Sequence, residues 1–366
     1  MKECDPNEDN SIIFETYTPY RDPMMQIDDY LSFIWTDRYY SPGDFEMCVP
    51  ATEKNLQWIK LGYLVGRMTD GVLEGNCGII EYIEKSMDEY GSARILVRGR
   101  FIGGFLYQRV IASQTILSAT SSLKSVIETL CDENAFNPSK SARFMHTFSV
   151  SQTGEAGPNV SNLQWTGQNL GESISAICEA NHIGWKVERA SDGEYVLSLY
   201  EGLDRTISQS TNTWAVFSDE DGSLKSLTYS EDTSAKVNSV RIAGEGEGSD
   251  RKIMWVDIPE STSEGYTRHE VWVDARDIQS NNGEVSDADY QEMLTNRAKE
   301  SFTDSEFVLE ATAAFVNLKY KTDVSLGDLC TIRCKSLGIE IDARLVEVIE
   351  SIDETGRYSA VPTFSI

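Results

Sequence analysis

The chain has 366 residues, of which 25% are charged and 40% are hydrophobic, and this composition excludes intrinsic disorder. Acidic residues outnumber basic ones by 59 to 32, and the net charge of -27 argues against a protein that grips nucleic acid through its phosphates. The acidic start, Met1–Asn10, lacks the apolar core of a signal peptide, and no run of about 18 apolar residues occurs. We expect a soluble chain made in the cytoplasm, without membrane insertion and with two or three domains.

Seven cysteines are spread over the chain, an odd number that does not describe a disulfide framework, so we interpret them as reduced thiols. Cys330 and Cys334, in CTIRC, would share one face of a strand. No second pair and no nearby histidine completes a zinc set, so core packing is the preferred interpretation of this pair.

The first third of the sequence, from Ile12 to about Ile111, alternates short β-type runs with turn signals. The runs are LSFIW (31–35), SPGDFEMCV (41–49), LGYLVGRM (61–68), NCGIIEYIE (76–84) and ARILVRGRF (93–101). Pro42-Gly43-Asp44, Asp70-Gly71 and Tyr90-Gly91-Ser92 stand where hairpins would reverse. This pattern predicts an antiparallel barrel or sandwich.

The middle of the sequence is predicted to mix helices and strands. A helix is expected over Thr120–Asn134, capped by Ser121 or Ser122, because its apolar residues recur at helical spacing. Residues 136–168 form a loop-rich stretch with one strand at Phe144–Val150. A second helix begins at Leu170 and is expected to stop near Gly184; the strands GWKVER and EYVLSLYEG follow, joined through Asp192-Gly193.

The last part returns to β-type runs. They are LKSLTYSED, VNSVRIAGEG, KIMWVDI and HEVWVDARDI, then FVLEATAAFV, DLCTIRC, IDARLVEVIESID and YSAVPTF. A helix between the two groups, Ser286–Phe302, would turn Tyr290, Leu294 and Ala298 inward. The stretch 216–310 has 22 acidic and 9 basic residues, so we expect this part to present the acidic surface.

Residues with catalytic potential are few and scattered. The three histidines, His146, His182 and His269, lie in different parts of the chain, and no nucleophile elbow or cysteine-hydrolase motif accompanies them. Acidic pairs suited to glycoside cleavage cannot be singled out among 59 acidic residues. We therefore predict no catalytic, cofactor-binding or metal-binding residue and no cofactor.

Two further motifs have a structural and a functional interpretation. Gly244–Gly248 alternates glycine with glutamate, which opposes phosphate binding and favours a tight β connection. Asp219–Gly222 superficially suggests a calcium loop, but its glycine and glutamate spacing is wrong. A β-turn is preferred there, with weak divalent-ion binding left open.

Eight segments, in order along the chain, resemble the siphophage hub-like tail protein family. They are SFIWTDRYYSPGDFEMCVPAT (32–52), GIIEYIE (78–84), VRGRFIGGFLYQRVI (97–111), YEGLDRT (200–206), VRIAGEGEGSDR (240–251), VWVDARDI (271–278), YKTDVSLGDLCTI (320–332) and PTF (362–364). The resemblance implies a mainly β fold similar to the central hub of contractile phage baseplates, with two tail-tube-like antiparallel β-barrels and an α+β module. The first barrel would span 1–118, the module 119–215, and the second barrel 216–366 with the helix 286–302.

The resemblance also implies a turn at a barrel entrance, with the signature Tyr320, Asp323 and Leu326-Gly327-Asp328. There Gly327 would permit the turn and Asp328 would bond backbone amides.

The family resemblance implies a structural, non-enzymatic role in the virion tail, assembled in the host cytoplasm. The chain would form a homotrimeric ring that contacts the tail tube, the distal tail proteins and the tail-tip or fibre proteins. Genomic DNA would pass through the lumen without specific binding, and three copies would carry three times -27, or -81. We expect the acidic residues of 216–310 to contribute to that lumen.

Two other functions are alternatives to this structural role. A tail-tip cell-wall hydrolase is disfavoured because such domains lie on extensions beyond the hub, whereas this chain ends at PTFSI. A carbohydrate-binding receptor protein would use aromatic side chains, but Trp35, Trp214, Trp255 and Trp272 lie in β-type runs where core packing is the commoner outcome. A phage, a prophage or a tailocin origin fits the sequence equally well.

Overall fold

The computed structural model describes residues 12–18, 22–69, 72–117, 120–151, 156–161, 163–190, 193–258, 265–280, 285–303 and 306–366. The chain forms two compact units, which we call the main unit (Met1–Leu227 with Ala311–Ile366) and the inserted unit (Thr228–Glu310). The predicted turn at Asp70-Gly71, Asp192 of a second turn, and Cys4 lie outside the described residues.

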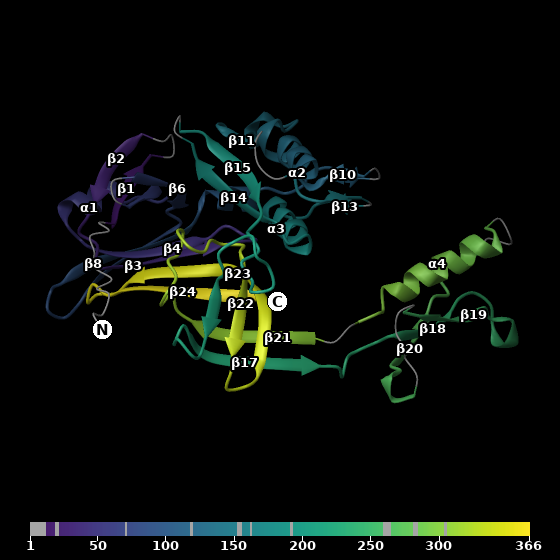
Figure 1. The fold of residues 1–366 in the computed structure, drawn as a ribbon. Coiled ribbons are helices and arrows are strands. Elements are labelled where there is room, and N and C mark those ends of the chain that lie inside the picture. Colours follow the sequence, from purple (N-terminus) through teal and green to yellow (C-terminus); the bar gives the residue numbers. More distant parts are fainter. Residues whose placement is uncertain are drawn as a thin grey trace. The chain divides into compact units, whose positions relative to one another are not determined.

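A large sheet in the main unit joins the two ends of the sequence (Figure 1). Its strand order is β16-β22-β23-β3-β4-β8-β7, and β24 also pairs with β23. The strands are β3 (Ser32–Arg38), β4 (Asp44–Pro50), β7 (Tyr82–Met87), β8 (Ala93–Arg100), β16 (Val216–Ser218), β22 (Leu329–Cys334), β23 (Ile339–Ile352) and β24 (Tyr358–Ser365). The antiparallel pairing of β23 with β3, which sets Glu350 opposite Trp35, connects the C-terminal strands to the N-terminal ones.

A second sheet of the main unit has the order β2-β1-β5-β6. It contains β1 (Ile12–Tyr17), β2 (Pro23–Ile27), β5 (Leu64–Thr69) and β6 (Val72–Ile79), and the short helix α1 (Glu53–Trp58) follows β4 in the chain. Aromatic rings of both sheets share one core, where Trp35 is fully buried and its ring lies 5.9 Å from that of Phe14. The core position predicted for Trp35 is therefore confirmed.

The run NCGIIEYIE was predicted as one strand, and this prediction was wrong. The chain breaks at Ile80 and Glu81, so that the run ends β6 in one sheet and begins β7 in the other. The predicted hairpin turns around Gly43 and Gly91 are confirmed, because β3 pairs with β4 and β7 pairs with β8 across them.

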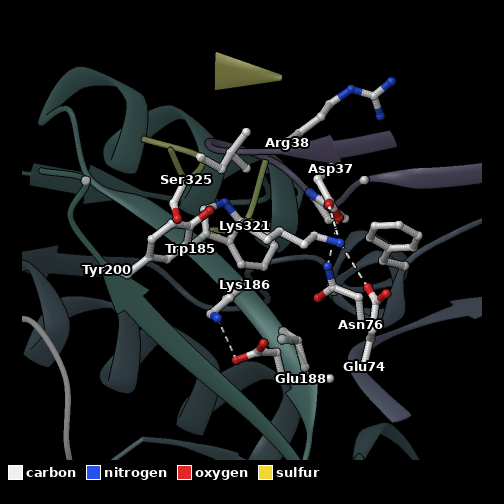
Figure 2. A pocket seen from close by; sticks show the side chains of 18 of the residues that line it. Asp37, Arg38, Glu74, Asn76, Trp185, Lys186, Glu188, Tyr200, Lys321 and Ser325 are labelled. Carbon is white, nitrogen blue, oxygen red and sulfur yellow. Dashed lines mark hydrogen bonds and ion pairs between the residues drawn. The ribbon is translucent and has the colours of Figure 1, made fainter. Parts of the chain in front are cut away.

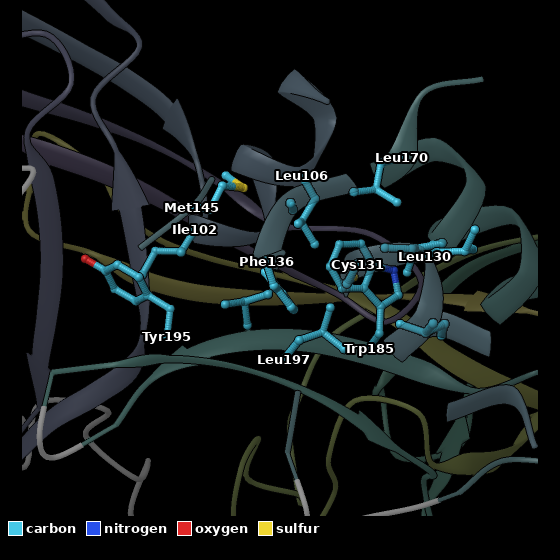
Figure 3. Close-up of a cluster of buried hydrophobic side chains, with 14 of the residues drawn as sticks. Ile102, Leu106, Leu130, Cys131, Phe136, Met145, Leu170, Trp185, Tyr195 and Leu197 are labelled. Carbon is cyan, nitrogen blue, oxygen red and sulfur yellow. The ribbon is translucent and has the colours of Figure 1, made fainter. Parts of the chain in front are cut away.

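The middle of the chain packs two helices and a 3₁₀ segment against the sheet β11-β15-β14 (Figure 3). The elements are β11 (Phe148–Val150), β14 (Gly184–Arg189), β15 (Tyr195–Tyr200), α2 (Leu123–Cys131), α3 (Leu170–Ala180) and the 3₁₀ segment η1 (Ile102–Gln108). Smaller elements are β9 (Thr115–Leu117), β10 (Ser121–Ser122), β12 (Asn159–Val160), β13 (Leu163–Trp165), η2 (Asp132–Phe136) and η3 (Ser141–Arg143). In Figure 3 Leu130, Leu197 and Trp185 lie in this buried cluster.

Both predicted helices are present, and their ends have clear causes. The hydroxyl of Ser122 accepts a hydrogen bond from the Ser125 amide and begins α2, as expected for a cap. Helix α3 ends at Ala180, earlier than predicted, because His182 takes a left-handed φ of 56°. Gly184 is instead the first residue of β14.

The inserted unit is a three-stranded sheet with one helix (Figure 1). The sheet order is β19-β18-β20, with β18 (Ser239–Ala243), β19 (Ile253–Asp257) and β20 (Glu270–Asp274), and the unit also has η4 (Gly248–Asp250) and η5 (Gly265–Thr267). Helix α4 (Asp287–Lys299) buries Tyr290, Leu294 and Ala298, as predicted from their spacing. Strands β17 (Leu224–Asp232) and β21 (Glu306–Ala313) pair with each other and contain the two points where the chain passes between the units.

The described part of the chain is mainly β, as expected, but none of its sheets closes into a barrel. The pairing of β23 with β3 instead places strands expected in two separate barrels in one open sheet. The domain boundaries at 118 and 215 remain predictions. Among the described helices, none is long and apolar enough to cross a membrane.

Candidate functional site

A polar cleft of about 720 Å³ lies in the main unit (Figure 2). Several distant stretches of sequence line it: the end of β3 with the turn that follows, Thr69 of β5 with residues 74–76 of β6, Phe101 and Gly103, β14 with the end of β15, and the segment 320–328. Its walls carry Arg38, Lys186 and Glu188 besides the groups described next, and Lys186 pairs with Glu188 at 2.8 Å. The cleft is therefore lined by charges of both signs.

Three residues that line the cleft, Asp37, Glu74 and Lys321, join Arg67 and Glu350 in a group of five ionisable side chains that we call the ion cluster. Arg67 donates to both carboxylate oxygens of Glu350, at 2.9 and 2.8 Å, and the two side chains are only 4% and 5% exposed. Arg67 Nε lies 3.0 Å from Glu74 Oε1, an ion-pair distance without hydrogen-bond alignment. The fork geometry holds β5 to β23 across 283 residues of sequence.

Lys321 contacts all three acids of the ion cluster. Its Nζ lies 3.0 Å from Glu74, 3.1 Å from Glu350 and 3.5 Å from Asp37, and Figure 2 shows it reaching between Asp37 and Glu74. The backbone of Lys321 adopts a left-handed φ of 66°, which costs a non-glycine residue about 1–2 kcal/mol. The ion pairs of Lys321 and the packing around it must offset at least this cost in stability.

Protonation in the ion cluster is set by burial and by neighbouring charges. Burial alone would raise the pKa of Glu350, but the hydrogen bonds and charge of Arg67 lower that pKa to about 2. Burial opposes protonation of Lys321, yet the carboxylates of Asp37 and Glu350 raise its pKa. Burial raises the pKa of Asp37, which accepts hydrogen bonds from Tyr320 (3.0 Å) and Asn76 (2.9 Å).

The segment 325–328 forms the turn expected from the family signature. Asp328 accepts hydrogen bonds from the backbone amides of Ser325 (2.8 Å) and Leu203 (2.7 Å) and pairs with Arg205 at 2.6 Å. Gly327 has a φ of 93°, and a Cβ there would lie 2.3 Å from the ring of Tyr39. The roles predicted for Gly327 and Asp328 are confirmed.

Three groups of this site are fixed charges, whereas burial raises the pKa of a fourth, Asp37. Lys321 and Arg67 have raised pKa values and Glu350 a lowered one, so all three stay ionised near neutral pH and none is poised to exchange a proton. The cysteines that the structure describes are buried, and burial raises the pKa of Cys77 and of Cys178 to about 12. The fixed charges of the ion cluster hold strands together.

The histidines occupy structural positions in three different places. His146 packs edge-on against Phe144, His182 ends α3, and the backbone of His269 bonds to Asn238. Over the described ranges no group of three metal-ligating side chains is found.

The two loop motifs form the turns predicted for them. Gly246 has a φ of 94°, and the connection from β18 to β19 folds back with a backbone bond from Lys252 to Glu245. The carboxylate of Asp219 accepts hydrogen bonds from the amides of Lys335 and Ser336 and from the Ser336 hydroxyl. Asp219 therefore holds the turn after β22.

Three of the four tryptophans predicted to pack in a core are exposed, so that prediction was wrong for them. Trp214 is 55%, Trp255 42% and Trp272 53% exposed. Trp255 and Trp272 alternate with inward residues along their strands, and α4 covers the opposite face of that sheet.

The ion cluster was not predicted, although the sequence contains a signal for it. Asp37 continues the inward alternation of Phe33 and Trp35 along β3, and Glu350 follows the buried Val348 along β23. A charge at an inward position of a strand needs a partner of opposite charge. The identity of that partner depends on strand pairing, which the alternation does not reveal.

The fold is shared along its whole length with tail proteins of known structure. Similar structures are the 43 kDa tail protein of prophage MuSo2 from Shewanella oneidensis (TM-score 0.58, 13% identity, 98% of each chain covered) and a tail protein from Neisseria meningitidis (0.53, 13%, 97% and 96%). The prophage tail protein gp18 from Listeria monocytogenes is also similar (0.52, 12%, 97% of this chain and 94% of that one). At 12–13% identity, the similarity to these structures establishes the fold of this chain and nothing more.

The family follows from the sequence match. The family described as Siphovirus ReqiPepy6 Gp37-like protein matches residues 14–364, and the chain belongs to it. The resemblance to siphophage hub-like tail proteins is thereby confirmed. A comparison with curated proteins finds no relative.

Proposed function

We propose that this chain is a structural phage or prophage tail protein that forms the trimeric hub ring between the tail tube and the tail tip. The observation that carries the proposal is the shared fold, which covers at least 94% of both chains in each of three tail proteins. Two features of the main unit suit a part that bears load: a sheet that joins both ends of the sequence, and the ion cluster that holds β5 to β23.

The open sheets suit a ring of several copies. Strand β7 lies at one edge of the large sheet, and five of its six residues are exposed, including Tyr82 and Met87. An exposed strand edge is a template for pairing with another chain. We propose that strands of neighbouring copies complete the two tail-tube-like walls predicted from the family resemblance.

In this proposal the ring is a conduit for DNA at ejection. The acidic residues of 216–310 would face the lumen, because repulsion keeps phosphates from adhering within a Debye length of about 8 Å. Partners would be the tail tube and distal tail proteins on one side and the tail-tip or fibre proteins on the other. The protein would reside in the virion tail.

Native mass measurement of the full chain, alone and mixed with tail-tube protein, tests the proposal. A trimer that binds the tube, seen as a ring by electron microscopy, is the expected result. A monomer under both conditions would contradict it. Zymography on host cell walls tests the competing hydrolase function, and a cleared band would favour that function over a purely structural one.

A further inference from the structure

Two exposed tryptophans flank an arginine on the outer face of the sheet in the inserted unit. Strand β18 lies between β19 and β20, and the register sets Arg241 directly opposite both Trp255 and Trp272. Helix α4 packs on the other side of the same three strands. We call the outer surface formed by Arg241, Trp255 and Trp272, with the charged side chains at its ends, the Trp–Arg face.

Among the residues that the structure describes on this face, Arg241 is the one cation whose charge is not compensated. Arg268 pairs with Asp257 at 3.1 Å and with Glu270 at 2.5 Å, and Arg251 pairs with Asp274 at 2.7 Å. Within the described residues Arg241 has no carboxylate partner, and its guanidinium carbon lies 5.0 Å from the centre of the Trp255 ring. The inserted unit as a whole, with 19 acidic and 8 basic residues over 228–310, is strongly acidic.

The two indoles are held in place before any ligand arrives. The Arg268 guanidinium lies 4.9 Å from the Trp255 ring centre, and that of Arg251 lies 5.7 Å from the Trp272 ring centre. Because Arg251 and Arg268 are themselves held by carboxylates, these cation–π contacts restrict the rings and lower the entropy cost of binding. The rings stand two strands apart, a separation of about 10 Å between their backbones.

The chemistry of the Trp–Arg face matches an acidic sugar chain. Indole rings offer flat apolar surfaces for the C–H faces of sugar rings, and a guanidinium offers paired donors for a carboxylate or a phosphate. We propose that the Trp–Arg face binds an acidic glycan, a sugar polymer that carries carboxylate or phosphate groups. The charge complementarity is local. The carboxylates at the ends of the face, Asp257, Glu270 and Asp274, are paired with Arg268 or Arg251, and acidic groups farther away are screened beyond about 8 Å.

The size of the face also favours a chain-like ligand over a folded protein. Three strands of five residues present about 250 Å². A stable protein interface needs about 800 Å² from each partner. A few sugar rings laid across the strands would fill the available surface.

Binding of the full chain to three polymers tests the proposal. The probes are polygalacturonate, which carries carboxylates, wall teichoic acid, which carries phosphates, and dextran, which is neutral; tryptophan fluorescence and titration calorimetry report binding. We expect saturable binding that weakens with salt for at least one acidic polymer and no binding for dextran. The two acidic arms identify which anion Arg241 prefers.

Variants locate the site on the chain. Arg241→Ala should weaken binding about tenfold, because it removes a charge-assisted hydrogen bond, and Trp255→Ala/Trp272→Ala should abolish it. Trp214→Ala is the matched control, since Trp214 is about as exposed as Trp272 but lies on the main unit. This variant should bind the polymer with the affinity of the wild type. Circular dichroism checks that each variant is folded.

Several outcomes would overturn the proposal. They are failure of both acidic polymers to bind, equal binding of dextran, and unchanged affinity in the double tryptophan variant. A native mass of Trp255→Ala/Trp272→Ala below that of the wild type would also overturn it, because the face would then form contacts between copies of the chain. The trimer proposal is judged separately, by the mass of the wild-type chain.

Discussion

Removing Arg67 should expose the energetic role of the ion cluster. The substitution Arg67→Met keeps a long side chain but leaves Asp37, Glu74 and Glu350 with Lys321 as their only cation within 4 Å among the described residues. Breaking a buried pair by deleting one partner costs about 3–5 kcal/mol, since the remaining charge stays buried. At the lower sensitivity expected for a large unit, about 2 °C per kcal/mol, the melting temperature of the main unit should fall by about 6–10 °C.

The pKa of Glu350 gives an independent value for the free energy that the buried pair contributes to stability. It lies at about 2 instead of 4.5, and a difference of that size corresponds to about 3 kcal/mol of stability. The folded pKa is the lower one, so this stability is complete above about pH 4.5 and is lost as the pH falls toward 2. The raised pKa of Asp37 acts in the opposite direction, because protonation of Asp37 on acidification favours the folded state.

Calorimetry of Arg67→Met at pH 7 and at pH 3 measures both effects. The difference from the wild type should be largest at pH 7 and should shrink at pH 3, where Glu350 of the variant is protonated. Arg98→Met is the matched control, because Arg98 makes an exposed pair with Glu46, and it should leave the melting temperature nearly unchanged. Equal shifts for Arg67→Met and Arg98→Met would refute the reasoning, as would a difference that grows on acidification.

Three other predictions concern single positions. Gly327→Ala should destabilise the main unit by about 1–3 kcal/mol more than Gly356→Ala in urea unfolding, because both glycines have positive φ but only Gly327 also meets the Tyr39 ring; equal costs would refute the clash. Tyr290→Phe should destabilise the inserted unit by about 1 kcal/mol in thermal unfolding, since the hydroxyl bonds to Glu245 and Ile278; no change would mean that water replaces these bonds. Cys131 should resist thiol reagents in the native protein and react on unfolding, because it is fully buried with a raised pKa; modification of native Cys131 would contradict this burial.

The exposure of Trp255 and Trp272 shows how a strand pattern can mislead. Both residues sit in runs rich in β-branched and aromatic residues, which fit either a buried strand or a half-buried one. Among the described residues of the inserted unit, α4 is the one α-helix, and it covers one face of the sheet. The tryptophans fall on the other face, a result that depends on which side α4 occupies.

Local patterns in the sequence were sufficient to predict most elements of the fold. Helices α2, α3 and α4 follow from apolar spacing and capping residues. The turn at Gly327 was implied by the family resemblance. The family resemblance rests on the same local segments. These features depend on interactions between residues close in the sequence, so the sequence alone determines them.

The long-range features were decided by tertiary structure. Pairing of β23 with β3 places strands of the two predicted barrels in one sheet, and Glu350 of β23 meets Arg67 and Lys321. The inward charges were visible in the sequence as breaks in apolar alternation, but their partners were not. Which carboxylate meets which cation depends on strand register across nearly 300 residues, and only the packing of the whole chain sets that register.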